Sequence, residues 1–220
     1  MTAGGVSVKG GHAVNQDRCV YRVLGDEAVV AVSDGLGSLP FSQYGAEALC
    51  SCVQEIFERK LDVDTDDLGG LIQRMWLERL CGRNADDCCA TALVCFVRRG
   101  VLTAAAVGDG YLCADADGEP LVFFDRKEDS FRNETKCLHS GPMDGDWRVA
   151  RRPCRRLNGV YLSSDGLTLM DESVEGISSF VRDFLASYRG KQAEEIDREM
   201  EDWMARWTGN DDKTAVYIIG

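Results

Sequence analysis

The chain is predicted to fold as an α+β protein in which antiparallel sheets are covered by pairs of helices. Short apolar runs rich in Val and Ala are typical of buried strands, and longer stretches with apolar residues three and four positions apart are typical of helices. The order along the 220 residues is strands, two helices, strands, two helices and a final strand. Because the helices occur in adjacent pairs instead of alternating with strands, a parallel βαβ arrangement is not expected.

Each expected element depends on a local pattern. Val-rich runs indicate the strands, Gly25-Asp26 is a hairpin turn, and Leu49, Val53 and Ile56 mark one face of the first helix. An acidic linker at 62–67 separates the first two helices. In chain order, we expect strands within 3–12 and at 19–24 and 28–32, helices at 42–60 and 68–81, strands at 90–98, 102–107, 111–115, 120–124 and 159–163, helices at 173–188 and 191–207, and a strand at 214–219.

Length and composition favour a single domain spanning residues 1–220. Apolar residues make up 45% of the chain, which is enough for a sizeable core. No apolar run approaches the ~18 residues of a membrane span, and the N-terminus lacks the regions of a signal peptide, so we expect a cytoplasmic protein. We also expect a monomer. The ten cysteines include no Cys-x-x-Cys pair and lie mostly in apolar patterns, which favours core positions over zinc binding.

The formal net charge of −12 restricts the partners. It disfavours binding to nucleic acid, and it would repel a phosphorylated substrate unless cations reversed the local field. Neither nucleic acid nor a membrane is therefore expected as a partner. The polar stretch 125–158 is long for a loop within a domain, and such excursions are commonly functional. Its four arginines within 151–156 either guide an anionic substrate or form a solvated loop.

Three of the expected strands end in Asp-Gly. An Asp at a strand end is held at the edge of a sheet, and the Gly permits a sharp turn or the close approach of a ligand. The candidate acidic residues are Asp34, Asp109 and Asp165 at these strand ends, together with Asp17 and Asp211 just before strands. Each alone is a common turn or cap residue. Their repetition at successive strand ends indicates a shared site.

A cluster of carboxylates is unfavourable without cations, because like charges ~4 Å apart repel each other. Mg²⁺ and Mn²⁺ prefer oxygen ligands over Cys or His. Two such ions ~3.5–4 Å apart can activate a water molecule between them. The pattern therefore predicts a centre for Mg²⁺ or Mn²⁺.

Six short motifs, each weak alone, follow one another along the chain: Asn15-Gln16-Asp17, Ser33-Asp34-Gly35-Leu36-Gly37, Cys89-Ala90-Thr91-Ala92, Gly108-Asp109, Ser164-Asp165-Gly166 and Asp211-Asp212-Lys213-Thr214. Together they resemble the motifs of metal-dependent Ser/Thr protein phosphatases of type 2C, particularly the compact bacterial branch. The resemblance spans nearly the whole chain. It implies a four-layer α-β-β-α sandwich, in which two central antiparallel sheets are flanked by helix pairs.

The resemblance also implies roles for the matching residues. Asp34 would bridge two core metal ions, and the Gly35 carbonyl would bind one of them. Asp165 and Asp211 would bind the other ion. Asp17 would hold metal-bound waters in the outer sphere or ligate weakly. A bridging water would then attack the phosphorus of phosphoserine or phosphothreonine in line, without a covalent intermediate.

By the same resemblance, Asp109 would belong to a third, more labile metal site. It is followed by Gly110-Tyr111, where relatives commonly have Ser-Arg, which weakens that assignment. The part of the polar excursion near the active site would act as a flap. The implied partners are phosphorylated proteins that a Ser/Thr kinase has modified, and the implied role is signal transduction.

His12 stands where many relatives have an Arg that grips the phosphate. We hypothesise that His12 contacts the substrate phosphate or acts as a general acid. Arg18 is a further candidate for binding the phosphate. The alternative is that His12 is a solvated or capping residue.

Two other functions stay open at this point. The first is a weakly active or inactive regulatory module on the same fold. It is favoured by the departures from the family pattern at His12, at Gly110 and at Asp212, which stands where the family usually has Asn. The second is a small-molecule phosphomonoesterase, because no motif reads a peptide. The presence of Asp34 with its two implied partner aspartates favours an active enzyme.

Overall fold

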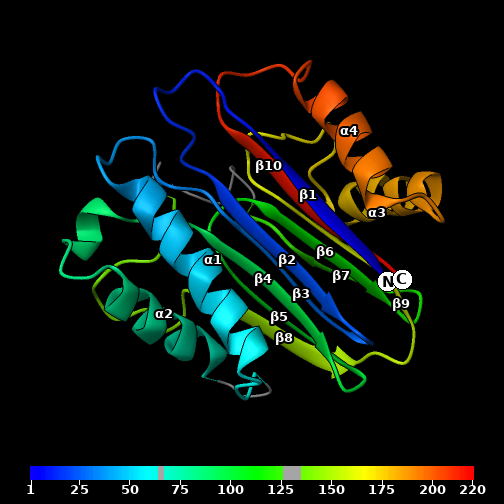
Figure 1. Ribbon diagram of the computed structural model, residues 1–220, viewed down its shortest axis with the longest axis horizontal. Coiled ribbons are helices and arrows are strands. Elements are labelled where there is room, and N and C mark those ends of the chain that lie inside the picture. The colour runs from blue at the N-terminus through cyan, green and yellow to red at the C-terminus, as the bar shows by residue number, and fades with distance from the viewer. Residues whose placement is uncertain (64–66, 126–134) are drawn as a thin grey trace.

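The computed structural model describes residues 1–63, 67–125 and 135–220 (Figure 1). They form two five-stranded sheets in which all neighbouring strands are antiparallel. In order across the sheet, the first contains β1 (Thr2–Val8), β10 (Lys213–Ile219), β9 (Leu157–Ser163), β6 (Tyr111–Ala116) and β7 (Glu119–Phe123). The second contains β2 (Arg18–Leu24), β3 (Glu27–Ser33), β4 (Ala92–Arg98), β5 (Val101–Val107) and β8 (Arg148–Pro153).

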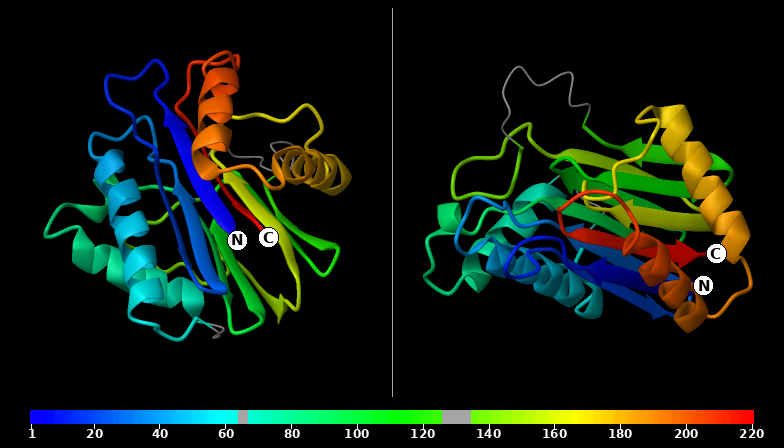
Figure 2. Two further views of the ribbon diagram at one scale, coloured as in Figure 1. Left: turned by 45° about the vertical axis from the view of Figure 1, so that its right-hand side comes forward. Right: turned by 90° about the horizontal axis from the view of Figure 1, so that it is seen from above.

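Helices cover the outer face of each sheet and complete four layers (Figure 2). On the second sheet lie α1 (Ser42–Glu58) and α2 (Leu68–Arg79), and on the first lie α3 (Val174–Tyr188) and α4 (Ala193–Met204). The predicted α+β sandwich with two antiparallel sheets is confirmed. None of the helices in these described segments has the length and apolarity that crossing a bilayer requires.

Strand β3 shows why the sheets form the centre of the molecule. Its residues Val29 and Ala31 pack among side chains of α1, whereas Val30 and Val32 belong to the core between the two sheets. Because successive side chains of a strand point to opposite faces, a strand covered on both faces must be apolar throughout. The continuous apolar runs in the sequence therefore correspond to strands between two layers.

Trp76 joins the two helices of the second sheet. Its buried indole Nε1–H donates a 2.9 Å hydrogen bond to the carbonyl oxygen of Gly45 on α1. A Cβ at Gly45 would overlap the carbonyl oxygen of Cys88, so glycine is needed for this close approach. The expected core positions of Trp76 and Cys88 are confirmed, and all ten cysteines are free thiols.

The polar stretch 125–158 differs from the surface loop that we expected. Its residues Arg148–Pro153 form β8, an edge strand that pairs with β5. Arg152 reaches across the sandwich, and its Nη2 donates to the carbonyl oxygens of Ala114 on β6 and Glu119 on β7. The arginines of this stretch interrupt the alternation of apolar and polar residues that would have indicated an edge strand. Residues 126–134 of the expected flap, and 64–66 of the acidic linker, lie outside the described residues.

Candidate active site

Strand ends from both sheets meet at one end of the sandwich. In the second sheet, β2 begins where β3 ends, with Arg18 opposite Ser33. In the first sheet, β6 begins where β9 ends, with Tyr111 opposite Ser163. Antiparallel pairing therefore brings the residues beside these strand ends together, although they are far apart in the sequence.

Asp17 links the two sheets at this end. The hydroxyl of Ser164 donates a 2.8 Å hydrogen bond to Asp17 Oδ2 and accepts the backbone N–H of Thr214 at 3.0 Å. Asp17 is only 1% exposed, and its other oxygen, Oδ1, is buried without a hydrogen-bond partner in the parts of the chain that the structure describes. An unpartnered buried carboxylate oxygen is costly. A cation bound at Oδ1 would remove that cost.

The backbone around Asp34 is held by Thr91. The N–H of Asp34 donates to Thr91 Oγ1 at 2.9 Å, and the N–H of Thr91 donates to the carbonyl oxygen of Asp34 at 2.7 Å. The hydroxyl of Ser33 donates to the carbonyl oxygen of Thr91 at 2.6 Å. These bonds fix the end of β3 against the segment before β4, so the position of the Asp34 side chain is set by the sheet.

Three of the other predicted aspartates lie near enough to Asp34 for their charges to act on it. Burial raises the pKa of Asp34 well above its usual range, and the charges of Asp17, Asp165 and Asp211 raise it further. The pKa of Asp17 is also raised, chiefly by burial. Without cations, the cluster therefore favours protonated carboxyls. A divalent cation would reverse this preference, because it favours the ionised form of each carboxylate nearby.

Asp211 and Asp212 differ in their surroundings. Asp211 is half exposed, and its Oδ1 lies 3.8 Å from His12 Nε2. Asp212 is buried, and its two oxygens accept the backbone N–H groups of Gly10 and Gln16, each at 2.7 Å. The carboxylate of Asp212 is thereby used to hold the loop before β2, whereas Oδ1 of Asp211 accepts the backbone N–H of Asp212 at 3.0 Å and lies beside His12.

Asp109 lies in the turn between β5 and β6 and has other neighbours. Its Oδ2 accepts the hydroxyl of Thr135 at 2.9 Å, and its charge acts on Arg148 and Cys137. The charge of Asp109 is not one of the main charges that raise the pKa of Asp34. Its recorded neighbours, Thr135, Arg148 and Cys137, thus differ from those of Asp34.

The two candidate phosphate-binding residues also differ. His12 lies over Gly37, where a Cβ would approach its Cε1 to 3.3 Å, so the glycine leaves room for the imidazole. Arg18 uses its Nη1 to donate to the carbonyl oxygens of Asn15 at 2.8 Å and Asp17 at 2.7 Å. Arg18 thus supports the loop that carries Asp17, and His12 is the residue that faces Asp211.

Gly35 is needed for the start of α1. A Cβ on Gly35 would lie 2.7 Å from the backbone carbon of Ser42, so the helix could not begin there. Ser42 also accepts a 2.7 Å hydrogen bond from Gln16 Nε2. The helix start, the Gly35 loop and the loop before Asp17 are therefore packed as one unit.

Tyr111 occupies the position after Asp109-Gly110 and is buried. Its hydroxyl donates to Glu172, which lies in the loop that follows Asp165. Burial and the carboxylate of Glu172 raise the pKa of Tyr111, so the phenol stays protonated and keeps this bond. Tyr111 therefore anchors the Asp165 loop to β6.

The oxygen atoms of these side chains suit a hard cation, although the side chains do not lie close enough together to form a complete metal site. Over the described ranges, no three His, Cys, Asp or Glu side chains are grouped closely enough to hold a metal ion. The cluster nonetheless offers carboxylate oxygens, with Asp17 Oδ1 unpartnered and the pKa of Asp34 raised by its acidic neighbours. Oxygen donors of this kind fit Mg²⁺ or Mn²⁺.

A comparison with known protein families identifies the family of this chain. A family model described as protein phosphatase 2C matches residues 5–207. The chain belongs to the protein phosphatase 2C family. The matched range includes the cluster residues Asp17, Asp34 and Asp165, and it ends before Asp211. No curated protein sequence matches the chain closely enough to add to this assignment.

Solved structures of the protein phosphatase 2C fold resemble the whole chain. The phosphatase Stp1 from Staphylococcus aureus has a TM-score of 0.70 at 13% identity, covering 99% of this chain and 94% of that one. RsbX in complex with magnesium has a TM-score of 0.65 at 18% identity, covering 97% and 92%. The SiaA-PP2C domain of Pseudomonas aeruginosa has a TM-score of 0.62 at 19% identity, covering 99% and 85%. At these identities the likeness shows the fold.

The structure also identifies residues of this candidate site whose contacts the sequence did not predict. Thr91, Ser164 and Asp212 carry the hydrogen bonds that position Asp34, Asp17 and the loop before β2. Their motifs were visible in the sequence, but a hydroxyl or carboxylate beside a strand does not show which backbone group it will meet. The roles of the predicted ligands and of His12 and Arg18 stay predictions.

Proposed function

We propose that this chain is a metal-dependent protein phosphatase that hydrolyses phosphoserine and phosphothreonine in proteins. The observation that carries the proposal is the convergence of Asp17, Asp34, Asp165 and Asp211 from both sheets at one end of the sandwich. Membership of the protein phosphatase 2C family supports the same activity. The unpartnered Asp17 Oδ1 supports a need for cations at this place.

In this proposal, two core Mg²⁺ or Mn²⁺ ions would be held by Asp34, the Gly35 carbonyl, Asp165 and Asp211, and Asp17 would hold metal-bound waters or ligate weakly through Oδ1. When bound, the ions would supply positive charge against the phosphate dianion and would lower the pKa of a bound water molecule. A structural neighbour, RsbX, was solved in complex with magnesium, which supports this class of ion. Asp109, whose neighbours differ, would serve only an auxiliary third ion.

The protein's own residues would orient the substrate and handle its charge. His12, which is half exposed and lies beside Asp211, would donate a hydrogen bond from its imidazole to a phosphoryl oxygen or would protonate the leaving alkoxide. Ser164 holds Asp17 in one orientation through its hydroxyl. The hydrogen bond between Thr91 and the backbone of Asp34 would hold the Asp34 loop in place when the phosphate enters the site.

The test is hydrolysis of a phosphothreonine peptide with Mn²⁺, measured as phosphate release. Asp34→Asn should abolish turnover, and Asp183→Asn, an exposed change on α3, should not. EDTA should stop the reaction, and added Mn²⁺ should restore it. Activity that survives EDTA would contradict the metal mechanism, and activity that survives Asp34→Asn would contradict the assigned centre.

A second candidate is a regulatory module on the same fold with little turnover. The observation that favours it is that Tyr111, which stands where relatives commonly have Arg, is buried and bonded to Glu172. One neighbouring structure comes from a study of the bacterial stressosome, a control system for signalling, which fits a regulatory partner. Mn²⁺ binding without phosphate release would favour this candidate. Faster hydrolysis of p-nitrophenyl phosphate than of phosphopeptides would favour a small-molecule phosphomonoesterase.

A further inference from the structure

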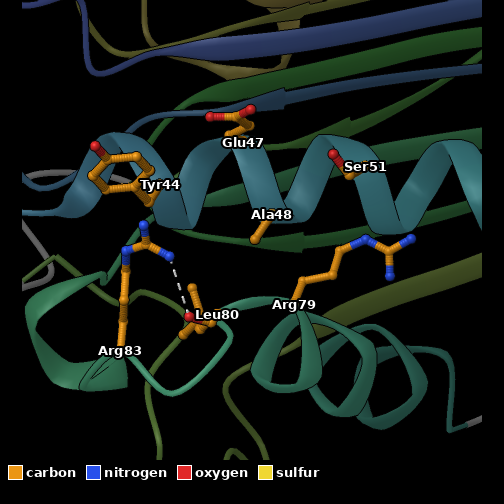
Figure 3. A pocket seen from close by; sticks show the side chains of 7 residues that line it. All are labelled: Tyr44, Glu47, Ala48, Ser51, Arg79, Leu80 and Arg83. Atoms are coloured by element: carbon orange, nitrogen blue, oxygen red, sulfur yellow. Dashed lines mark hydrogen bonds between the residues drawn. The ribbon is translucent and has the colours of Figure 1, made fainter.

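A groove of about 330 Å³ lies between α1 and the end of α2 (Figure 3). One wall is a stripe of α1 that includes Tyr44, Glu47 and Ala48, which share a face because they are three and four residues apart. The other wall contains Leu80 and Arg83, which follow α2. None of these residues belongs to the acidic cluster.

Arg83 brings an uncommitted positive charge into the groove. Its guanidinium carbon lies 4.3 Å from the centre of the Tyr44 ring, a cation–π contact. Its Nη1 makes one long bond of 3.4 Å to the carbonyl oxygen of Leu80. Over residues 1–63, 67–125 and 135–220, no carboxylate lies within ion-pair distance of Arg83. The neighbouring Arg79, by contrast, is paired with Glu55. Most donors of the Arg83 guanidinium therefore stay available.

The backbone sets the direction of Arg83. Cys81 and Gly82 both have positive φ, of 52° and 82°, and this turn brings the chain back toward α1. A Cβ at Gly82 would meet nothing within 4 Å, so the backbone conformation and not the space favours glycine there. A guanidinium fixed by its backbone and by an aromatic ring loses less freedom when it binds a ligand.

Aromatic and apolar side chains lie in and beside the groove, among its charged residues. Phe41 and Tyr44 are 44% and 39% exposed, and their ring centres are 6.2 Å apart. Ala48 and Leu80 line the groove itself. Exposed Tyr with Arg is a combination enriched in protein interfaces. These residues suit a peptide segment that carries both an acidic and an apolar side chain.

The groove lies next to the acidic centre along α1. Ser42, which packs against Gly35, is only two residues before Tyr44. A protein segment in the groove would therefore leave the rest of that protein close to the Asp34 loop. In a chain of net charge −12, Arg83 makes the groove a local exception to the general repulsion of acidic segments.

We propose that this groove docks an acidic segment of the phosphoprotein substrate, with a carboxylate on Arg83 and an apolar side chain against Tyr44, Ala48 and Leu80. The proposal rests on the proposed phosphatase function and names how its substrate is held. Glu47 lines the same groove and opposes negative charge. The acidic side chain therefore lies on the Arg83 side, and removing the charge of Glu47 strengthens binding.

The test is the affinity of a fluorescein-labelled peptide of alternating Glu and Leu, followed by fluorescence anisotropy. Arg83→Gln weakens binding roughly tenfold, the effect of losing a charge-assisted hydrogen bond. Glu47→Gln tightens it about twofold. Arg74→Gln, an exposed change on α2 outside the groove, leaves it unchanged. The Trp76 indole N–H resonance, which reports the α1–α2 contact, shifts with the peptide.

Equal affinities for wild type and Arg83→Gln, or for the Glu peptide and a matching Lys peptide, would overturn the proposal. A substrate experiment separates docking from chemistry. Arg83→Gln raises KM for phosphorylated casein and leaves turnover of p-nitrophenyl phosphate unchanged. An unchanged KM for casein would overturn substrate docking. Failure to hydrolyse p-nitrophenyl phosphate and casein at all would instead overturn the proposed function, and the peptide affinities would still decide whether the groove binds acidic segments.

Discussion

The carboxylate of Asp212 accepts a 2.7 Å hydrogen bond from the backbone N–H of Gln16, the residue before Asp17. Its second oxygen accepts the N–H of Gly10 at the same distance. Asp212 thus closes both ends of the loop that carries His12. Asp212 is therefore a buried carboxylate with both oxygens used.

Asp212→Asn should destabilise the protein by about 1–2 kcal/mol, because its amide nitrogen would face one of the two N–H groups and could not accept it. We also expect slower phosphopeptide hydrolysis, since the loop that carries His12 would loosen. Urea unfolding and initial rates measure the two effects. Asp202→Asn, an exposed change on α4, is the control and should change neither the stability nor the rate of hydrolysis. Unaltered stability of D212N would show that the two backbone bonds contribute little.

Thr91→Val should remove the acceptor of the Asp34 N–H while keeping the shape of the side chain. Leaving this N–H without its partner costs about 1–3 kcal/mol of unfolding free energy. Thr91→Ser keeps the hydroxyl and should recover most of the stability and activity. If Val and Ser at this position behave alike in urea unfolding, the hydroxyl is not what holds the Asp34 loop.

Asp34→Asn should stabilise the metal-free protein near neutral pH. Burial and neighbouring charges raise the pKa of Asp34 above its unfolded value, so the folded protein binds this proton more tightly than the unfolded chain. Stability without metal is therefore lost as pH rises from the unfolded pKa through the raised folded pKa. Melting temperatures with and without Mn²⁺ test this, because Mn²⁺ should stabilise wild type more than D34N. A lower melting temperature of metal-free D34N would contradict the argument.

His12→Gln should lower kcat/KM for a phosphothreonine peptide by about a hundredfold if the imidazole acts as general acid. The melting temperature should hardly change, because His12 is half exposed. The other histidine offers a control: His139→Gln should leave kcat/KM as it is. Equal turnover by H12Q and wild type would assign His12 to the solvated alternative.

Arg152→Ala should destabilise the sandwich by about 1–3 kcal/mol, because two carbonyl oxygens of the opposite sheet lose a charged donor. Arg155→Ala, an exposed change in the same arginine cluster, should stay within about 0.5 kcal/mol of wild type. Chemical unfolding of both variants is the measurement. Equal effects would mean that the inter-sheet bonds of Arg152 add nothing to stability.

Local patterns were enough to predict most elements of the fold. Strands such as β3 and β4 are apolar throughout because they are covered on both faces, and that signal lies within a few residues. Strand β8 was not predicted, because it lies at the edge of its sheet and is rich in arginine. The side chains of Arg148 and Arg152 bond to carbonyl oxygens that are distant in the sequence. Such a strand is stabilised by partners that its own sequence does not reveal.

The sequence by itself determined the sandwich and the acidic residues at its strand ends, because hydrophobic periodicity and Asp-Gly turns are local properties. Only the tertiary structure decided how those residues differ. Asp17 and Asp34 share one buried cluster, Asp109 faces Thr135, and Asp212 holds backbone N–H groups. The physical reason is that burial, charge coupling and hydrogen-bond partners arise from segments up to two hundred residues apart, which antiparallel pairing alone brings together.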